Sequence, residues 1–176
     1  MIYFDQNKEA YNNRKTLENW GNTCIYSCED DKYKDFLLGK YIWNENNELV
    51  LNPEWDDIVL NKIKQVKYQD NDAARDIALN QGVTYNNILF DSDTDQKINL
   101  LATVSQMSET DTVEWFGMNN DSLVCTKQDL INIGSLITAL HSFCWTKNAE
   151  IKEVVRNAST VEEIKTIQID YTLTEE

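Results

Sequence analysis

The sequence predicts an α+β protein in which small antiparallel sheets pack with helices and one long connecting helix joins two parts of the chain. Short segments rich in β-branched and aromatic residues alternate with turn residues, which is typical of strands in hairpins. Several other stretches have apolar residues at helical spacing and begin at capping residues. Hydrophobic residues make up 41% of the 176 residues, enough for the core of one ordinary domain or two small ones.

Acidic residues dominate the charge of the chain. Lys and Arg number 16 against 30 Asp and Glu, which gives a formal net charge of −14. Such a surface repels phosphate groups, so we expect neither nucleic acid nor an anionic membrane as a partner. No apolar run approaches the roughly 20 residues that span a bilayer. The first residues lack the basic and apolar regions of a secretory signal, so synthesis in the cytosol is expected.

Residues 1–52 are predicted to form an N-terminal β-rich module around one small helix. Residues 2–4 and 24–28 have the composition of strands. A helix is expected over residues 29–40, because it has acidic residues in its first turn and Gly39 as a C-terminal cap. The segments KYIW and ELVL then flank NENN, and this pattern predicts a hairpin because Asn tolerates the left-handed backbone of a tight turn.

A connecting helix is predicted for residues 53–81, with Asn52 as its N-cap and Gly82 beyond its end. Its apolar residues keep a spacing of four and three except where Asp70 falls on the seam. They are Trp55, Val59, Ile63, Val66, Ala73 and Ile77. The favoured interpretation is one face of a core helix, because fewer than four heptads are sustained. The alternative is packing on a neighbouring chain, for which the candidate partner-binding residues are Trp55, Val59, Ile63 and Val66.

Residues 82–176 are predicted to form an α+β domain that folds on its own. Residues 83–90 indicate a strand with an irregular middle, and residues 113–116 and 123–125 indicate a hairpin. We expect these segments to make one three-stranded antiparallel sheet. Downstream of the last helix, residues 170–176 are expected to be a frayed tail.

Two capping boxes predict the last two helices. Thr126 with Asp129 opens one helix, and Thr160 with Glu163 opens a short one. The buried face of the first is expected to hold Leu130, Ile133, Ile137, Leu140 and Cys144.

Alternating aspartates in the middle of the chain raise the question of a calcium loop. Asp91, Asp93 and Asp95 stand at every second position, but such a loop needs Gly at its sixth position and Glu at its twelfth. Gln96 and Ala102 occupy those places, so we interpret the segment as a helix start in which Asp93 is the N-cap and Gln96 closes a capping box. The helix is then expected to bury Ile98, Leu101, Ala102 and Ser105.

Other chemical signals are weak. Cys24, Cys28, His141 and Cys144 are conceivable zinc ligands, but the Cys24 to Cys28 spacing is one residue longer than in zinc ribbons, so free structural thiols are favoured. His141 is expected to be a hydrogen-bonded structural residue beside a core face. The 5 glycines are not clustered, so no phosphate loop is present. We therefore predict no catalytic residue, no metal and no cofactor.

The arrangement of residues 69–170 resembles a domain-of-unknown-function family found in bacteriophages and prophages. The resemblance rests on the Phe90-Asp91 strand end followed by Asp93, the Trp115 to Val124 hairpin, the helix with His141, and the final NASTVEEI. Members are typically encoded among tail and tail-fibre genes, and no catalytic residue of the family exists to carry over.

The resemblance implies a non-enzymatic phage tail or prophage tail-like particle protein that makes protein–protein contacts in the tail-fibre or baseplate region. Its partners would be other tail or fibre proteins, with a homo-oligomer as a further expectation. It would lie in the host cytoplasm during assembly, or in the virion tail. A tail-fibre assembly chaperone and a host-glycan-binding module are the alternatives.

Overall fold

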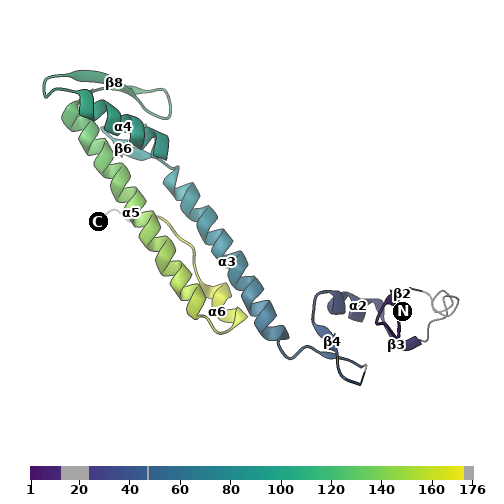
Figure 1. Ribbon diagram of the computed structural model, residues 1–176. Coiled ribbons are helices and arrows are strands. Elements are labelled where there is room, and N and C mark those ends of the chain that lie inside the picture. The colour runs from purple at the N-terminus through teal and green to yellow at the C-terminus, as the bar shows by residue number, and fades with distance from the viewer. Residues whose placement is uncertain (13–23, 47, 173–176) are drawn as a thin grey trace. The chain divides into compact units, whose positions relative to one another are not determined.

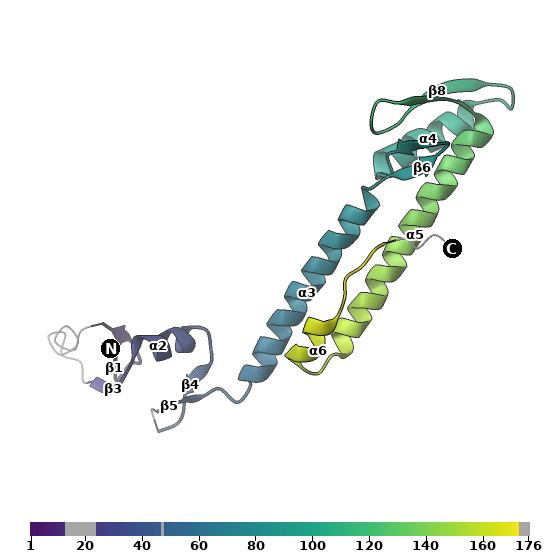
Figure 2. The same ribbon diagram turned by 180° about the vertical axis from the view of Figure 1, so that it is seen from behind.

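The computed structural model describes residues 1–12, 24–46 and 48–172, and the chain divides into two compact units, Met1–Asn61 and Lys62–Glu176 (Figures 1 and 2). Small antiparallel sheets and helices occur in both units, which confirms the predicted α+β class. The division lies inside the long helix α3 (Trp55–Leu79), whereas the sequence had indicated Gly82. The larger part of α3, from Lys62 onward, belongs to the second unit because it packs against the long helix α5 (Lys127–Asn157).

The first unit contains a three-stranded sheet with the order β2-β1-β3. Strand β1 (Ile2–Asp5) pairs with β2 (Ala10–Tyr11) and with β3 (Cys24–Cys28), both antiparallel. The predicted helix is α2 (Asp30–Leu37), and the predicted hairpin consists of β4 (Tyr41–Trp43) and β5 (Leu49–Leu51).

An aromatic cluster forms the core of the first unit. Phe4 is fully buried, and its ring centroid lies 5.9 Å from that of Tyr33, 5.7 Å from Phe36 and 5.1 Å from Trp43. Gly39 has a φ of 90° after α2, as a C-terminal cap requires, and its backbone N–H donates to Phe36 O.

The second unit contains two separate hairpins, and the expected three-stranded sheet is wrong. Residues 83–90 are not one irregular strand but β6 (Val83–Tyr85) and β7 (Ile88–Phe90) joined by Asn86 and Asn87. These two asparagines have φ values of 49° and 63°, and positive φ at both central residues is the requirement of a type I′ turn.

The second hairpin pairs β8 (Thr112–Phe116) with β9 (Ser122–Thr126) in the predicted place. A backbone hydrogen bond joins the two hairpins, in which Met118 N donates to Leu89 O over 2.8 Å. A Cβ on Gly117 would come within 2.5 Å of that same carbonyl oxygen, so glycine permits the close approach.

Capping residues place the three remaining helices where the sequence predicts them. Helix α4 (Thr94–Gln106) starts with the Asp93 side chain accepting from Gln96 N, α5 (Lys127–Asn157) has the capping box of Thr126, and α6 (Val161–Thr166) has that of Thr160. The five residues predicted for the buried face of α5 are all buried, which confirms the helical spacing. Among the described residues, no helix combines the length and apolar character needed to cross a membrane.

The second half of α3 and the long α5 lie side by side and antiparallel within the second unit (Figures 1 and 2). Lys64 Nζ donates to Arg156 O, and further along α3 the Asn71 amide donates to Asn148 O. One core cluster lies between them and contains Ala78, Leu140, Cys144, Ile151, Val155 and Tyr171. A second cluster lies under α4 and the hairpins and contains Phe90, Leu100, Cys125, Leu130, Ile133 and Ile137.

Residue Tyr171 corrects the expectation of a frayed tail. It is only 9% exposed, and its hydroxyl donates to the Asn71 Oδ1 over 2.7 Å. Residues 173–176, the rest of that predicted tail, lie outside the described residues. Ile167, Ile169 and Tyr171 of the C-terminal segment therefore pack into the core.

Candidate protein-contact surfaces

The heptad-spaced stripe of α3 lies at the surface in the second unit, so its interpretation as a core face is wrong. Val66 is 55% exposed and Ile77 is 66% exposed, while Ala73 is also exposed and Ile63 is half-buried. The core side of α3 is instead formed by Tyr68, Asn71, Ala74 and Ala78. This side lies about a third of a turn around the helix from the stripe. The fold of the single chain thus leaves the stripe without a covering element in the described part of the unit.

The four candidate partner-binding residues are divided between the two units. Trp55 and Val59 belong to the first turns of α3 in the first unit, and both are half-buried. Ile63 and Val66 belong to the second unit, where the stripe continues to Ile77. The role of these residues in partner binding stays a prediction.

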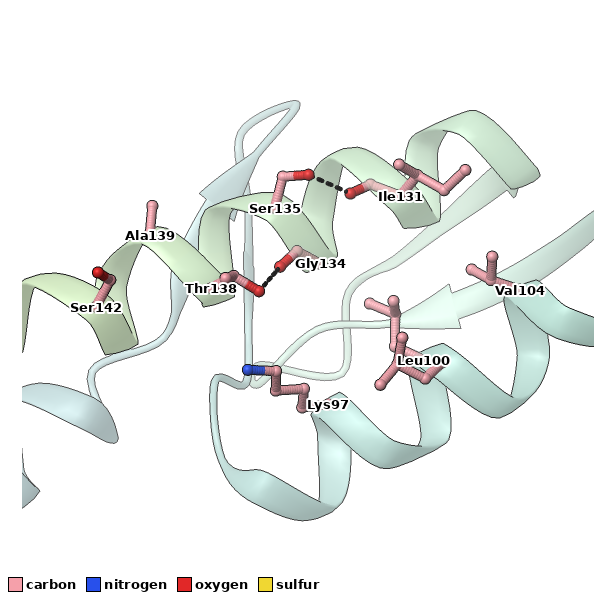
Figure 3. Close-up of a pocket in the computed structure, with 10 residues that line it drawn as sticks. Lys97, Leu100, Val104, Ile131, Gly134, Ser135, Thr138, Ala139 and Ser142 are labelled. Carbon is pink, nitrogen blue, oxygen red and sulfur yellow. Dashed lines mark hydrogen bonds between the residues drawn. The ribbon is translucent and has the colours of Figure 1, made fainter.

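A groove of about 500 Å³ runs between α4 and α5 (Figure 3). Lys97, Leu100 and Val104 extend from α4 toward α5, whose near side carries mainly small residues. Gly134 lets the helices approach, since a Cβ there would meet Leu100 Cδ2 at 3.0 Å. The α5 wall is formed by Ile131, Gly134, Ser135, Thr138, Ala139 and Ser142.

The exposed side of α4 differs from the expected one. Ile98 and Leu101 are 58% and 60% exposed, and Ala102 and Ser105 are exposed too, so the predicted buried stripe is wrong. Leu100 is the fully buried residue of this helix, because it fits against Gly134. The apolar residues of α4 therefore occur on both sides of the helix, and the sequence pattern alone does not decide which side is covered.

Two hydroxyl groups of the α5 wall are satisfied within the helix. Ser135 Oγ donates to Ile131 O over 2.9 Å, and Thr138 Oγ1 donates to Gly134 O over 2.8 Å (Figure 3). These bonds turn the methyl and methylene groups outward and leave few polar groups for a ligand. The groove is consequently suited to aliphatic side chains.

Lys97 is the one charged residue among those that line the groove. No Asp, Glu, Lys or Arg occurs between Lys97 and Glu109 or between Asp129 and Lys147, in a chain whose charged fraction is 26%. The sequence interpretation missed this surface. The feature of the sequence that could have indicated it is the long run without Asp, Glu, Lys or Arg from Leu130 to Thr146, because many residues of this run are not buried in the core.

A partly buried polar network joins α3 and α5 around Asp72 and Asn148. Asn148 Nδ2 donates to Asp72 Oδ1, which also accepts from Arg75 and Lys152. Burial alone would raise the pKa of Asp72, but the hydrogen bonds from Lys152 and Asn148 outweigh burial and hold that pKa below its usual value. Arg75 also lies 4.3 Å from the Trp145 ring centroid. The network fixes the register of the two helices, as single polar core residues do in coiled coils.

The residues considered for metal binding or catalysis have structural partners. His141 Nε2 lies 2.7 Å from Ser92 O, which confirms the predicted hydrogen-bonded histidine. Burial raises the pKa of Cys144, and it raises that of Cys125 to about 11, so these thiols stay protonated at neutral pH. Over the described ranges, no group of three or more His, Cys, Asp or Glu is placed to hold a metal ion.

A second, more polar groove of about 740 Å³ lies between α4 and β8. Asn99 and Gln106 from α4 face Trp115 and Phe116 from β8 across it. Phe116 is 58% exposed, and the Trp115 Nε1 is buried with no hydrogen-bond partner among the described residues. Amide and aromatic side chains together can bind a sugar ring, so this groove bears on the glycan-binding alternative.

Together, the fold and these faces define an α+β protein in which α3, α4 and α5 carry exposed apolar residues. A family model described as Domain of unknown function (DUF4376) matches residues 62–172, and the chain belongs to this family. The match begins at the first residue of the second unit. No curated protein and no solved structure matches the chain.

Proposed function

We propose that the chain is a non-enzymatic protein of a bacteriophage or phage-tail-like particle that makes protein–protein contacts in the tail-fibre or baseplate region. The setting is supported by the resemblance of residues 69–170 to a phage and prophage family. The proposed location is the host cytoplasm during assembly, with the virion tail as the second. The proposed partners are other tail or fibre proteins.

The exposed stripe of α3 is the observation that supports a contact function best. Its spacing of four and three is the pattern of a helix that receives a second helix by knobs-into-holes packing. Val66 and Ile77 are more than half exposed. Covering the exposed part of each side chain would contribute about 1–2 kcal/mol, so several such residues together can hold a partner.

Charges beside the stripe define the chemistry of the partner helix. Lys62 and Lys67 flank the stripe near its start, Asp70 lies on the seam midway along it, and Asp76 flanks its end beside its ion-pair partner Arg75. We infer an amphipathic helix with acidic residues opposite the lysines and basic residues opposite the aspartates, because charges beside a helix seam select partner and direction.

A matched pair of variants tests the proposed contact. Val66→Lys should abolish co-purification of the chain with the tail and fibre proteins encoded beside it. Val154→Lys is the control, because Val154 is also 55% exposed but lies on α5. Equal capture by both variants, with unchanged thermal unfolding, would refute the assignment of the stripe.

The alternatives make different predictions in the same system. An assembly chaperone binds a fibre protein in lysates but is missing from purified particles, which a mass-spectrometric inventory would show. A glycan-binding module uses the groove between α4 and β8, so Phe116→Ala would weaken retention on host-cell polysaccharide while Val66→Lys would not.

A further inference from the structure

We propose that the groove between α4 and β8 binds an extended peptide segment of a partner protein, that this segment carries a lysine or arginine, and that it pairs with the free edge of β8 as an added strand. This contact is separate from the α3 stripe and does not depend on the proposed function. It rests on the direction of the β8 backbone groups, on the residues that line the groove and on the sign of their charges.

The backbone of β8 has unused hydrogen-bonding groups on the side away from β9. Gly117 N donates to Asp121 O at the end of the hairpin. Bonded and non-bonded pairs alternate along an antiparallel ladder, so the next residues of β8 that bond to β9 are Trp115 and Val113. No hydrogen bond among the described residues reaches the outward N–H and C=O groups of the alternate residues. These residues are Thr112, Glu114 and Phe116.

The groove lies along this free edge and not against one face of the hairpin. Alternate residues of a strand point to opposite faces, so a groove against one face would be lined by every second residue. The groove is instead lined by consecutive residues from Asp111 to Phe116, and none of the β9 residues, all of which the structure describes, lines it. A peptide in the groove would therefore lie beside β8 as the next strand of the sheet.

Amide side chains of α4 form the opposite wall. Gln96, Asn99 and Gln106 line the groove together with Thr103, and their spacing of three and four puts them on one face of the helix. The three amide groups have no hydrogen bond within the described part of the chain. An amide both donates and accepts, so these side chains can bond to the edge of the peptide that faces away from β8.

The charges of the groove favour a basic residue in the peptide. Asp111 and Glu114 are the only charged residues among those that line it. Neither forms an ion pair within the described ranges, and the nearby Lys127 is paired with Glu109. The Glu114 carboxylate accepts a hydrogen bond from Ser122 Oγ over 2.7 Å and is exposed. A lysine or arginine opposite Glu114 would therefore gain a carboxylate partner at the rim.

The unpaired edge also distinguishes a peptide from a sugar as the occupant. A peptide repeats its N–H and C=O groups at the strand spacing of about 3.4 Å per residue, which matches β8. A sugar ring carries hydroxyl groups without that repeat and has no basic group to meet the carboxylates. The backbone and the charges together favour the peptide over the glycan alternative for the same groove.

Amide NMR of the isotope-labelled full chain with the synthetic peptide Thr-Val-Lys-Val-Thr tests the pairing. The peptide sequence reads the same in both directions, so its lysine can lie opposite Glu114 whichever way the added strand runs. The amide resonances of Glu114 and Phe116 should move downfield, because these N–H groups gain an acceptor. Those of Val113 and Trp115, which already bond to β9, should move less. Unchanged resonances at Glu114 and Phe116 with millimolar peptide would overturn the proposal.

Two methylated versions of the peptide test whether the backbone is recognised. Methylating the backbone nitrogen of the lysine, or of the valine that follows it, removes one N–H group and keeps every side chain. Only alternate N–H groups of an added strand face β8, so the two versions should differ in affinity by about tenfold. Equal affinities would rule out strand addition.

A charge reversal tests the basic residue. Glu114→Lys should weaken binding of the lysine peptide about tenfold at low ionic strength, and it should bind Thr-Val-Glu-Val-Thr instead. Asp121→Lys is the matched control, because Asp121 is an exposed acidic residue of the same hairpin that does not line the groove. Equal losses in the two variants would indicate general attraction to an acidic surface and would overturn the site.

The remaining outcomes separate this proposal from the glycan alternative and from the proposed function. If host-cell polysaccharide shifts the amide resonances along β8 and the peptides do not, the groove binds a glycan and the proposal is overturned. Val66→Lys should leave peptide binding unchanged, because Val66 lies on α3. Loss of tail-protein capture in that variant, with peptide binding intact, would support two separate surfaces, whereas loss of both would contradict their independence.

Discussion

Removing one hydroxyl group at Tyr171 should destabilise the second unit measurably. The Tyr171 hydroxyl donates to Asn71 Oδ1 over 2.7 Å, and Asn71 is fully buried. Tyr171→Phe keeps the ring but leaves that buried oxygen without its donor. An unsatisfied buried acceptor costs about 1–3 kcal/mol. We therefore expect the free energy of unfolding to fall by about this amount.

Urea unfolding followed by far-ultraviolet circular dichroism measures the change, because α3 and α5 dominate the helical signal. Tyr41→Phe serves as the control, since the Tyr41 hydroxyl has no hydrogen bond among the described residues, and it should change stability by about 0.5 kcal/mol or less. The double variant with Asn71→Leu should be less destabilised than the sum of the two single variants, because it removes both polar partners together. Additive losses, or no loss in Tyr171→Phe, would refute the described role of this bond.

Three further predictions concern stability. Asp93→Ala should lower the free energy of unfolding by about 1 kcal/mol, because the N-cap of α4 is lost. Millimolar calcium should not raise the melting temperature of the unmodified chain. A rise in melting temperature with calcium that this variant abolishes would restore the ion-binding hypothesis. The pKa of Asp72 is lower in the folded chain than in the unfolded chain, so its contribution to stability is present above the unfolded pKa of about 3.9 and is lost as the pH falls through the folded pKa. Asp72→Asn should therefore reduce the pH dependence of the free energy of unfolding in that window. An unchanged pH profile would contradict this assignment. The fragment 62–176 should unfold cooperatively on its own while 82–176 should not, since the latter lacks Asn71 and the rest of α3; cooperative unfolding of 82–176 would return the division to Gly82.

Helix starts were predictable from the sequence because caps are local. Asp93, Thr126 and Thr160 each accept from a backbone N–H three residues ahead, so their signal needs no knowledge of the rest of the fold. Asn52 also accepts from Glu54 N, but α3 begins at Trp55, two residues later than predicted. The tight turn at Asn86 and Asn87 was also local, but the pair was interpreted as an irregularity within a strand.

The buried faces of α3 and α4 were harder to predict because apolar residues lie on more than one side of each helix. In α3 the core position belongs to Asn71, whose amide reaches a carbonyl 77 residues away. In α4 the decisive neighbour of Leu100 is Gly134, a residue with no side chain to signal its role. Both faces depend on contacts between distant segments, and the same is true of the groove beside Gly134.

The bond between Tyr171 and Asn71 has a consequence for synthesis of the protein. It joins residues 100 positions apart, so α3 emerges from the ribosome long before the residue that closes its core. Until Tyr171 emerges, Asn71 and the apolar residues beside it stay open to solvent and to other nascent chains. Chaperones and proteases therefore have longer access to α3 than to the later helices of the second unit, and a chain truncated before Tyr171 would leave Asn71 Oδ1 without its donor permanently.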